Sequence, residues 1–533
     1  MAGMGNLLKD TRIFWAGLVV ICAAGAAIFL HATAQGPIGY SDSAAYMVAG
    51  RNLANGVGLG YHFPDGRFIT LTHYPPLYPV FFAIFETLGL DLVRAGQTLN
   101  LLAFLGAIVL LALMFKRFAR QAWLGLIAAG LFISLPATLA VYTSLMTDGL
   151  FTTLLLLSLF SLLSYWHSRR AGWWWAAIVT TAALPLLRYV GIAMLGAMPL
   201  LLGLLHAGPI RERLRRAGAF ALAALAPVGA WFLWVFVDEA SFGGRSLTLD
   251  SLDVFLQSFR GQFINTLWSW LPFTRPPYTP GYAARQLIVL AGFAGALYLV
   301  WRMRGKQARQ GQPVDGGTAL FGGAALMTVA HAISMLAAFL IIVPQPDVTE
   351  RTLLPLFALG LILLLTLVDL HGAAYPRWSP ALAGLVVAGA ALFLAAFARP
   401  TWYQVQSLHS DSQGFFSDRW RHSSLMASLA DIPEGQLLVS DRAAALLYWA
   451  DKPAYELLES MDDSFLLAEL SFGSNPSWQG QVVFAHQGAW LVIFDDFEDW
   501  TWRAWGVHGR RDGLLNGLDI IGDYSDATIY AAP

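Results

Sequence analysis

Four ionisable side chains lie at the edges of long apolar segments, where charge is uncommon. Asp42 follows the first such segment in the sequence GYSDSAAY, and Asp148 precedes a later one in TSLMTDGL. Arg188 interrupts an apolar stretch in LRYVG, and Arg351 begins another in ERTLLP. Charged groups beside or within membrane spans are costly, so they often mark a site or a pathway. A carboxylate can serve as a general base, and an arginine can bind a phosphate through two parallel hydrogen bonds.

Each of these side chains also has a purely structural interpretation. An aspartate just before a helix can cap its N-terminus, which stabilises the helix by ~1 kcal/mol, and both Asp42 and Asp148 could do so. Arg351 could extend toward the membrane surface or pair with Glu350. Taken alone, Asp42 fits a cap better. Both carboxylates are expected at the outer face of the membrane. This shared placement favours chemistry instead, because together they could bind an acceptor or a cation.

The elements that position these residues must lie in a membrane. The chain has 533 residues, of which 57% are hydrophobic and 13% are charged. An ordinary soluble domain has about a quarter of its residues charged, so the composition predicts an all-α polytopic membrane domain. Cys22 is the only cysteine and lies in an apolar segment, which excludes a disulfide framework and a cysteine-based metal site.

Eleven apolar segments are expected to cross the bilayer, for which a helix needs about 20 residues. The expected spans are 13–30, 97–115, 121–142, 149–166, 172–186, 190–206, 214–237, 284–302, 317–343, 352–370 and 378–398. Basic clusters between spans, such as Lys116-Arg117 and Arg169-Arg170, should face the cytoplasm. This orientation places the N-terminus inside and the C-terminal region outside the inner (plasma) membrane.

Two segments near the N-terminus have alternative interpretations. The first apolar run ends in Ala32-Thr33-Ala34, which is similar to a leader-peptidase site, but the run is longer than a usual leader and more spans follow. We therefore expect an uncleaved first helix. Residues 75–90 form a short apolar run with several prolines at its start, so we expect a helix that lies at the outer leaflet without spanning it.

The charge distribution predicts a second domain. Residues 401–533 hold 19 of the 34 acidic residues but only 7 of the 33 lysines and arginines. We therefore expect a transmembrane domain at 1–399, with an outside loop at 31–96, and a soluble extracytoplasmic domain at 400–533. Short β-like runs there alternate with apparent helices, which predicts a small α/β domain. The runs are 436–440, 490–494 and 527–530, and the helices are 417–431 and 441–450.

Several other chemistries lack support in the sequence. The glycines at 56–60 do not have the spacing of a dinucleotide-binding loop and lie outside the cell. The histidines, His331 among them, show no zinc-binding spacing. The acidic residues at 495–499 lack the spacing and glycine of a calcium-binding loop, so we expect a solvated loop. We expect no metal ligand set and no nucleic-acid partner.

The order of the motifs resembles that of a known enzyme class. Asp42 lies in a first outside loop, followed by the sequence HYPPLYP, by Asp148 at a second outside loop, by LRY around Arg188 and by RTLLP from Arg351. This arrangement is similar to that of the GT-C type integral-membrane glycosyltransferases. It most resembles the branch that contains protein O-mannosyltransferases and lipid A aminoarabinose transferases, over about residues 10 to 400.

The resemblance implies roles for particular residues. Asp42 matches the first-loop acid that serves as catalytic base, and Asp148 matches the second-loop acid. Tyr46 would line the acceptor side. His73 and Tyr74 stand where relatives carry a lysine before the Pro-Pro pair, and this departure affects one phosphate contact.

The implied reaction moves a hexosyl or pentosyl group from a polyprenyl-phosphate carrier to an acceptor hydroxyl, with inversion. The acceptor could be a glycan, a lipid or a protein. Arg188 and Arg351 would stabilise the charge on the departing phosphate. A divalent cation could bind near Asp42 and Asp148. Some relatives carry a paired acidic motif where this chain has the single acid of Ser41-Asp42-Ser43, which weakens the case for an obligatory metal.

Two other functional classes remain open at this point. A transporter or flippase of polyprenyl-linked lipids would also place charge near helix ends, but such proteins typically contain two related halves, and we find no such repeat. A non-catalytic cell-envelope assembly protein could use the acidic C-terminal region as a binding surface. Loss of the Asp42 carboxylate would inactivate an enzyme and would spare an assembly protein.

Overall fold

The computed structural model describes most of the chain and is mostly helical. The described residues are 11–206, 208–238, 246–247, 260–270, 314–343, 348–410, 414–433, 435–456, 488–494 and 518–531. Among the predicted elements, the span at 284–302 and the acidic loop at 495–499 lie outside these residues.

The chain divides into two compact units. The first, which we call the helical unit, comprises Met1–Ala34, Thr98–Ala240 and Arg245–Ser410. The second, which we call the tail unit, comprises Gln35–Gln97, Ser241–Gly244 and Asp411–Pro533. The first outside loop therefore clusters with the C-terminal region. The division at 399/400 remains a prediction.

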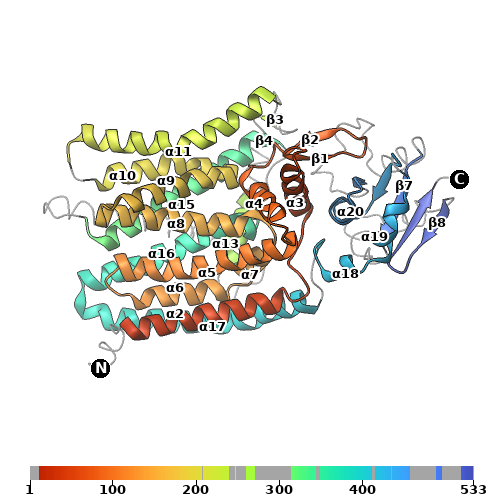
Figure 1. Ribbon diagram of the computed structural model, residues 1–533. Coiled ribbons are helices and arrows are strands. Elements are labelled where there is room, and N and C mark those ends of the chain that lie inside the picture. The colour runs from red at the N-terminus through yellow and green to blue at the C-terminus, as the bar shows by residue number, and fades with distance from the viewer. Residues whose placement is uncertain are drawn as a thin grey trace. The chain divides into compact units, whose positions relative to one another are not determined.

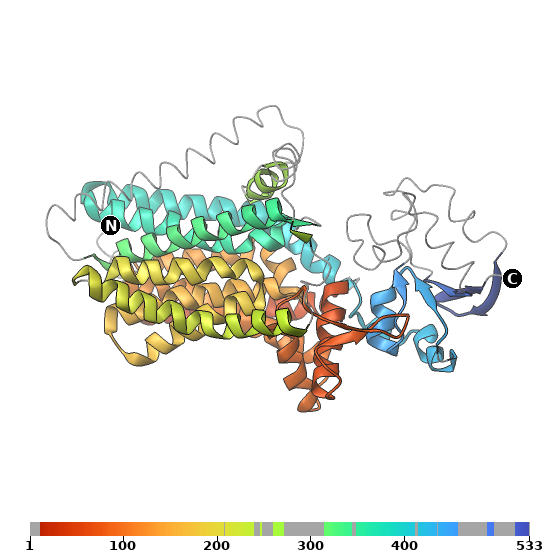
Figure 2. The same cartoon turned by 90° about the horizontal axis from the view of Figure 1, so that it is seen from above.

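Helices make up the helical unit, and the long ones lie side by side, roughly parallel (Figure 1, Figure 2). They are α2 (Thr11–Ala32), α5 (Leu92–Phe118, which starts in the tail unit), α6 (Trp123–Ser134), α7 (Pro136–Thr143), α8 (Thr147–Ser168), α9 (Ala171–Leu187), α10 (Ile192–Leu205), α11 (Ile210–Asp238), α13 (Arg260–Ser269), α15 (Gly316–Ile341), α16 (Glu350–Ala374) and α17 (Ser379–Ser410). Short connecting elements are η1 (Tyr189–Gly191), η3 (Pro376–Trp378) and the pair of β3 (Ser246–Leu247) with β4 (Ile342–Val343). Most of these helices are apolar on all sides, as expected for helices that contact both lipid and neighbouring helices.

Seven helices of the described residues are long and apolar enough to cross a membrane. An eighth span arises if α6 and α7, which are bent by 71° at a break, count as one. Pro136 begins α7 and lacks the N–H that would continue α6, which explains the break. Helices α9 and α10 occupy two predicted spans, but with 17 and 14 residues they are shorter than a typical span. The chain is thus a multi-pass membrane protein, and the count of eleven is not confirmed.

The N-terminal part of the tail unit surrounds Asp42. It contains α3 (Ser41–Ala54), a hairpin of β1 (Gly60–His62) and β2 (Phe68–Thr70), and α4 (Leu77–Thr87). Helix α4 lies in the segment expected as a short helix, and it is too short to span a bilayer. Asn52 of α3 donates a hydrogen bond of 2.8 Å to the carbonyl of Gly60, which fixes the hairpin to the helix.

The C-terminal part of the tail unit contains a five-stranded sheet in the order β6-β5-β7-β9-β8. Strands β5 (Leu438–Ser440), β6 (Tyr455–Glu456) and β7 (Trp490–Phe494) are parallel, and β9 (Ala527–Ala531) pairs antiparallel with β7 and β8 (Asp519–Asp523). The accompanying helices are α18 (Asp418–Arg421), α19 (Ser424–Ser428), η4 (Leu429–Asp431) and α20 (Ala443–Ala450). Three of these strands and α20 match predicted elements, whereas β6 and β8 do not correspond to any predicted run.

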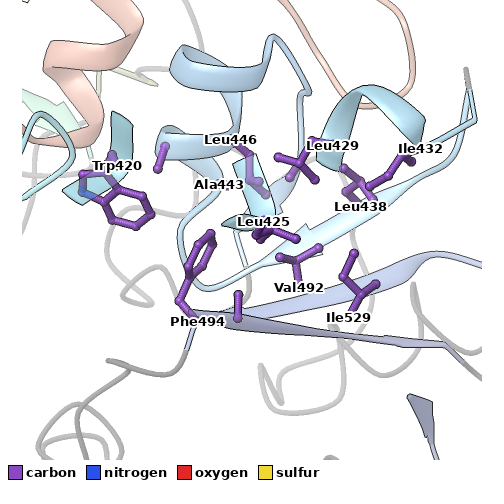
Figure 3. Close-up of a cluster of buried hydrophobic side chains, with 13 residues drawn as sticks. Trp420, Leu425, Leu429, Ile432, Leu438, Ala443, Leu446, Val492, Phe494 and Ile529 are labelled. Carbon is purple, nitrogen blue, oxygen red and sulfur yellow. The ribbon is translucent and has the colours of Figure 1, made fainter. Parts of the chain in front are cut away.

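The sheet is covered on two sides within the tail unit. One cluster of buried side chains joins the helices to the strands, with Trp420, Leu425 and Leu446 facing Val492 and Ile529 (Figure 3). A second cluster joins the strands to the β1-β2 hairpin through Phe63, whose ring lies 5.4 Å from that of Tyr455 at 88°. The hairpin of the first outside loop is therefore part of the hydrophobic core of the tail unit.

A close backbone contact holds the start of the first outside loop against the C-terminal region. Gly39 and Gly414 form a parallel bridge, and the N–H of Phe415 donates to the Gly39 carbonyl at 3.1 Å. A Cβ at Gly414 would lie only 1.9 Å from that carbonyl oxygen, so a side chain is excluded there. This contact lies three residues before Asp42 and orients the entry into α3.

Candidate active site

Asp42 lies in the first turn of α3 and is not its cap. The helix begins at Ser41 with Tyr40 as the capping position, and the Tyr40 N–H donates to the Ser43 hydroxyl at 3.1 Å. The cap interpretation of Asp42 is therefore wrong. A carboxylate in the first turn of a helix is still favoured electrostatically by the positive N-terminal end of the helix dipole.

Aromatic residues surround Asp42 in the tail unit. The Tyr74 hydroxyl donates a hydrogen bond of 2.5 Å to Asp42 Oδ1. Tyr74 in turn packs edge-on against Tyr46, with ring centroids 4.8 Å apart, and lies 4.0 Å from the His73 ring. Tyr46 is only 3% exposed. We call Asp42, Tyr46, His73 and Tyr74 the Asp42 cluster, and the structure brings all four predicted residues together.

Asp148 occupies the first turn of α8 in the helical unit. It is 2% exposed, and no side-chain hydrogen bond caps the helix, whose capping position is Met146. The turn before it is fixed by Asn100 of α5, which donates to the Ser144 carbonyl at 2.5 Å. A buried carboxylate requires charged or hydrogen-bonding partners, because burial without them costs several kcal/mol.

Two arginines supply those partners. Arg188 forms an ion pair with Asp148 Oδ1, and Arg351 Nε lies 3.7 Å from Asp148 Oδ2. Arg188 also donates to the Thr147 hydroxyl at 3.3 Å. The guanidinium groups are themselves half-buried, with side chains 24% and 30% exposed. We call Asp148, Arg188 and Arg351 the Asp148 cluster; the sequence predicted its members but not this pairing.

Each arginine lies at the end of a helix. Arg188 is extended, with φ −149° and ψ 130°, and separates α9 from η1. Arg351 lies in the first turn of α16, four residues before Pro355. The neighbouring Glu350 accepts a hydrogen bond of 2.7 Å from the Ser269 hydroxyl. Arg351 pairs with Asp148, and the sequence did not suggest this partner.

The Asp148 cluster does not fit a divalent cation. Two guanidinium groups already neutralise its carboxylate, and a metal ion at Asp148 would meet their like charge at close range. Within the described ranges, no group of three or more His, Cys, Asp or Glu side chains could hold a metal ion. A cation beside Asp42 remains a prediction from the sequence.

Sequence analysis missed His331 and Ser334, which lie on α15 near the Asp148 cluster. His331 is 1% exposed, and its Nε2 lies 3.3 Å from the carbonyl oxygen of Thr352, the residue after Arg351. Its isolation in a long apolar segment was the available signal, because an ionisable residue within a span marks a functional site by default. Zinc-ligand spacing concerns sets of ligands, so it does not identify a single histidine within a span.

Comparison with known proteins supports the fold. No protein-family model matches the chain, and no curated protein matches it in sequence. ArnT from Cupriavidus metallidurans bound to undecaprenyl phosphate is 14% identical with a TM-score of 0.52, and the match covers 97% of this chain and 99% of that one.

Two further solved structures are similar over nearly the whole chain. The oligosaccharyltransferase AglB from Archaeoglobus fulgidus, in complex with an inhibitory peptide and a dolichol-phosphate, is 13% identical with a TM-score of 0.53, covering 97% of this chain and 74% of that one. The arabinofuranosyltransferase AftD from Mycobacteria is 18% identical with a TM-score of 0.54, covering 97% of this chain and 40% of that one. The chain has the fold of these GT-C glycosyltransferases, so the fold expected from the motif order is confirmed.

Proposed function

We propose that this protein transfers a sugar from a polyprenyl-phosphate carrier to an acceptor hydroxyl at the extracytoplasmic face of the plasma membrane. The solved structures of similar fold include one bound to undecaprenyl phosphate and one bound to dolichol-phosphate. A lipid-linked phosphosugar needs no nucleotide, which is absent outside the cell. Its hydrocarbon tail also needs a membrane protein beside the reacting atoms.

The Asp148 cluster is the observation that supports this proposal most directly. One carboxylate is shared by two guanidinium groups, so the cluster has a net positive charge next to buried helix ends. Such an arrangement suits a phosphate, because guanidinium groups stay charged and present planar pairs of donors. Asp148 would act as a positioning residue that keeps the two like charges close together in the absence of ligand.

Asp42 would be the general base. The acceptor oxygen attacks the anomeric carbon while the bond from that carbon to the phosphate oxygen breaks, and the electron pair remains on the phosphate. Asp42 takes the acceptor proton as the new bond forms, and attack from the opposite face inverts the anomeric centre. The developing phosphate charge would be stabilised by Arg188 and Arg351.

The other members of the Asp42 cluster would orient the base and the acceptor. The hydrogen bond from Tyr74 uses Oδ1 of Asp42, so Oδ2 would receive the acceptor proton. Tyr46 is buried behind Tyr74 and would support its orientation. His73 packs against Tyr74 and would face the sugar or the acceptor.

The test begins with lipid analysis of a deletion strain. We expect one polyprenyl-phosphate sugar to accumulate. We expect the purified protein in nanodiscs to convert that lipid to polyprenyl phosphate when a membrane extract of the deletion strain supplies the acceptor that receives the sugar. The matched control is Asp42→Asn, which retains the shape of the side chain. Complementation of the deletion by Asp42→Asn, with the lipid profile restored, would contradict catalysis and favour the transporter or assembly alternatives.

A further inference from the structure

Helix α15 contacts the backbone beside both arginines of the Asp148 cluster. His331 Nε2 lies 3.3 Å from the carbonyl oxygen of Thr352, the residue that follows Arg351. A carbonyl oxygen only accepts, so Nε2 carries the proton in this contact. Three residues further along α15, the Ser334 hydroxyl donates to the Val190 carbonyl at 3.0 Å. Positions three apart share one face of a helix.

The first turn of α16 lacks one of its own backbone hydrogen bonds. Pro355 lies within α16 and has no N–H, so the Arg351 carbonyl cannot receive the helical hydrogen bond from that position. This turn carries the Arg351 side chain toward Asp148. The His331 contact to the next carbonyl therefore adds to the capping box of Thr349 and Thr352 in fixing this turn.

The segment that carries Arg188 is in a similar position. Arg188 is extended between α9 and η1, and Val190 lies in η1, two residues later. The Ser334 contact anchors this turn to α15. The His331 side chain itself is buried, and its Nδ1 has no hydrogen-bond partner among the described residues. Phe151 of α8, one turn from Asp148, lies 5.9 Å from the His331 ring.

From these contacts we propose that His331 and Ser334 are positioning residues that set the separation and orientation of Arg351 and Arg188 for a lipid-linked phosphate. This inference rests on the proposed function. His331 acts through the Thr352 carbonyl on Arg351, and Ser334 acts through the Val190 carbonyl on Arg188. Neither residue needs to touch the phosphate.

The test compares binding of undecaprenyl phosphate with binding of undecaprenol, which lacks the phosphate, to the purified full-length protein in detergent. His331→Leu should weaken binding of the phosphate roughly tenfold, as expected for loss of one buried hydrogen bond, and leave undecaprenol binding unchanged. His331→Gln retains a donor and should restore phosphate binding. Ser334→Ala should show a smaller loss in the same direction.

Thr328→Val is the matched control, because Thr328 is buried on α15 and, among the described residues, its hydroxyl donates to its own helix, at the Ala324 carbonyl, 2.8 Å away. This variant should bind both lipids normally. In an Arg351→Ala background, His331→Leu should have no further effect, since it acts through the missing side chain.

Different results would contradict the positioning role of His331 and the proposed function. Equal phosphate affinity of the wild-type and His331→Leu proteins would overturn the positioning role, provided that the wild-type protein prefers the phosphate to undecaprenol. Equal loss of both lipids in His331→Leu would also overturn it, because that result indicates general damage to the bundle. A wild-type protein without preference for the phosphate would overturn the proposed function and this inference together.

Discussion

Asp42 in the tail unit and Asp148 in the helical unit have the same residue type and the same helical position but opposite surroundings. Asp42 and Asp148 each lie in the first turn of a helix, one position after its first residue. Asp42 is half-buried and receives a hydrogen bond from a tyrosine, whereas Asp148 is 2% exposed and held by two arginines. The helix position therefore does not determine what each carboxylate does.

This difference assigns separate roles. Both oxygens of Asp148 are engaged by guanidinium groups, so this carboxylate is placed to hold the arginines. A carboxylate beside neutral donors keeps an oxygen for an incoming proton. Two carboxylates in such different environments usually have different roles in catalysis. We therefore propose that Asp42 does the chemistry and that Asp148 maintains the anion site.

The largest effect on turnover is expected for Asp42→Asn. The substitution removes the base and retains the shape, so transfer should fall by about 10² to 10⁴. The melting temperature should stay near that of the wild-type protein, because Asp42 makes no ion pair in the described structure. Steady-state transfer and thermal unfolding of the same preparation measure both. Near-normal turnover would end the assignment of Asp42 as base.

Asp148→Asn should differ from Asp42→Asn, because it should reduce stability as well as activity. Removing one partner of a buried ion pair leaves uncompensated charge, and here it leaves two arginines close together, which we expect to cost about 3 kcal/mol. The melting temperature should fall, and binding of undecaprenyl phosphate should partly offset the fall because the phosphate replaces the missing carboxylate. Unchanged stability without lipid would show that Asp148 does not hold the arginines.

Arg351→Lys distinguishes phosphate binding from simple charge. Lysine keeps the charge but loses the planar pair of donors, so turnover should decrease strongly if Arg351 binds the lipid phosphate. Glu350→Gln is the matched control, because Glu350 is adjacent and accepts a bond from Ser269 on the surface. Exposed contacts of this kind contribute ~0 to 1 kcal/mol, so the control should retain turnover. Wild-type rates for Arg351→Lys would remove this arginine from the site.

Tyr74→Phe should have a smaller effect on the Asp42 cluster. The ring and its contact with Tyr46 remain, and only the hydrogen bond to Asp42 is lost. A hydrogen bond to a charged group contributes about 1.5 to 3 kcal/mol, of which water would replace a part at a half-exposed site, so turnover should fall by roughly tenfold. A loss as large as that of Asp42→Asn would instead indicate that Tyr74 takes part in proton transfer directly.

The sequence predicted the membrane class and the site residues because these depend on local signals. Apolar length located most of the helices, and charge beside apolar runs identified Asp42, Asp148, Arg188 and Arg351. The pairing of Asp148 with arginines 40 and about 200 positions away is set by packing between helices, which has no local signal in one sequence. The same reason explains why the hairpin around Phe63 was not predicted to join the core of the C-terminal sheet.

A third aspartate tests whether capping and chemistry can be separated. Asp526, in the turn before β9, accepts hydrogen bonds from the Ser424 hydroxyl at 2.7 Å and from the Leu425 N–H at 3.2 Å, so it supplements the cap residue Ser423 at the start of α19. Burial acts to raise the pKa of Asp526, but hydrogen bonding with Ser423, Ser424 and the Leu425 N–H outweighs it and lowers the pKa below its usual value.

Asp526→Ala is expected to give the smallest effect, a loss of ~1 kcal/mol in stability of the tail unit at neutral pH and no change in turnover. Because the pKa is lower in the folded state, the contribution of Asp526 is fully present above the unfolded value of about 3.9 and disappears as pH falls through the folded value. The melting temperatures of the wild-type and variant proteins should therefore differ at pH 7 and converge toward pH 3. A constant difference across this range would mean that the carboxylate charge is not what holds α19, and a loss of turnover at pH 7 would mean that capping and catalysis in the tail unit are not independent.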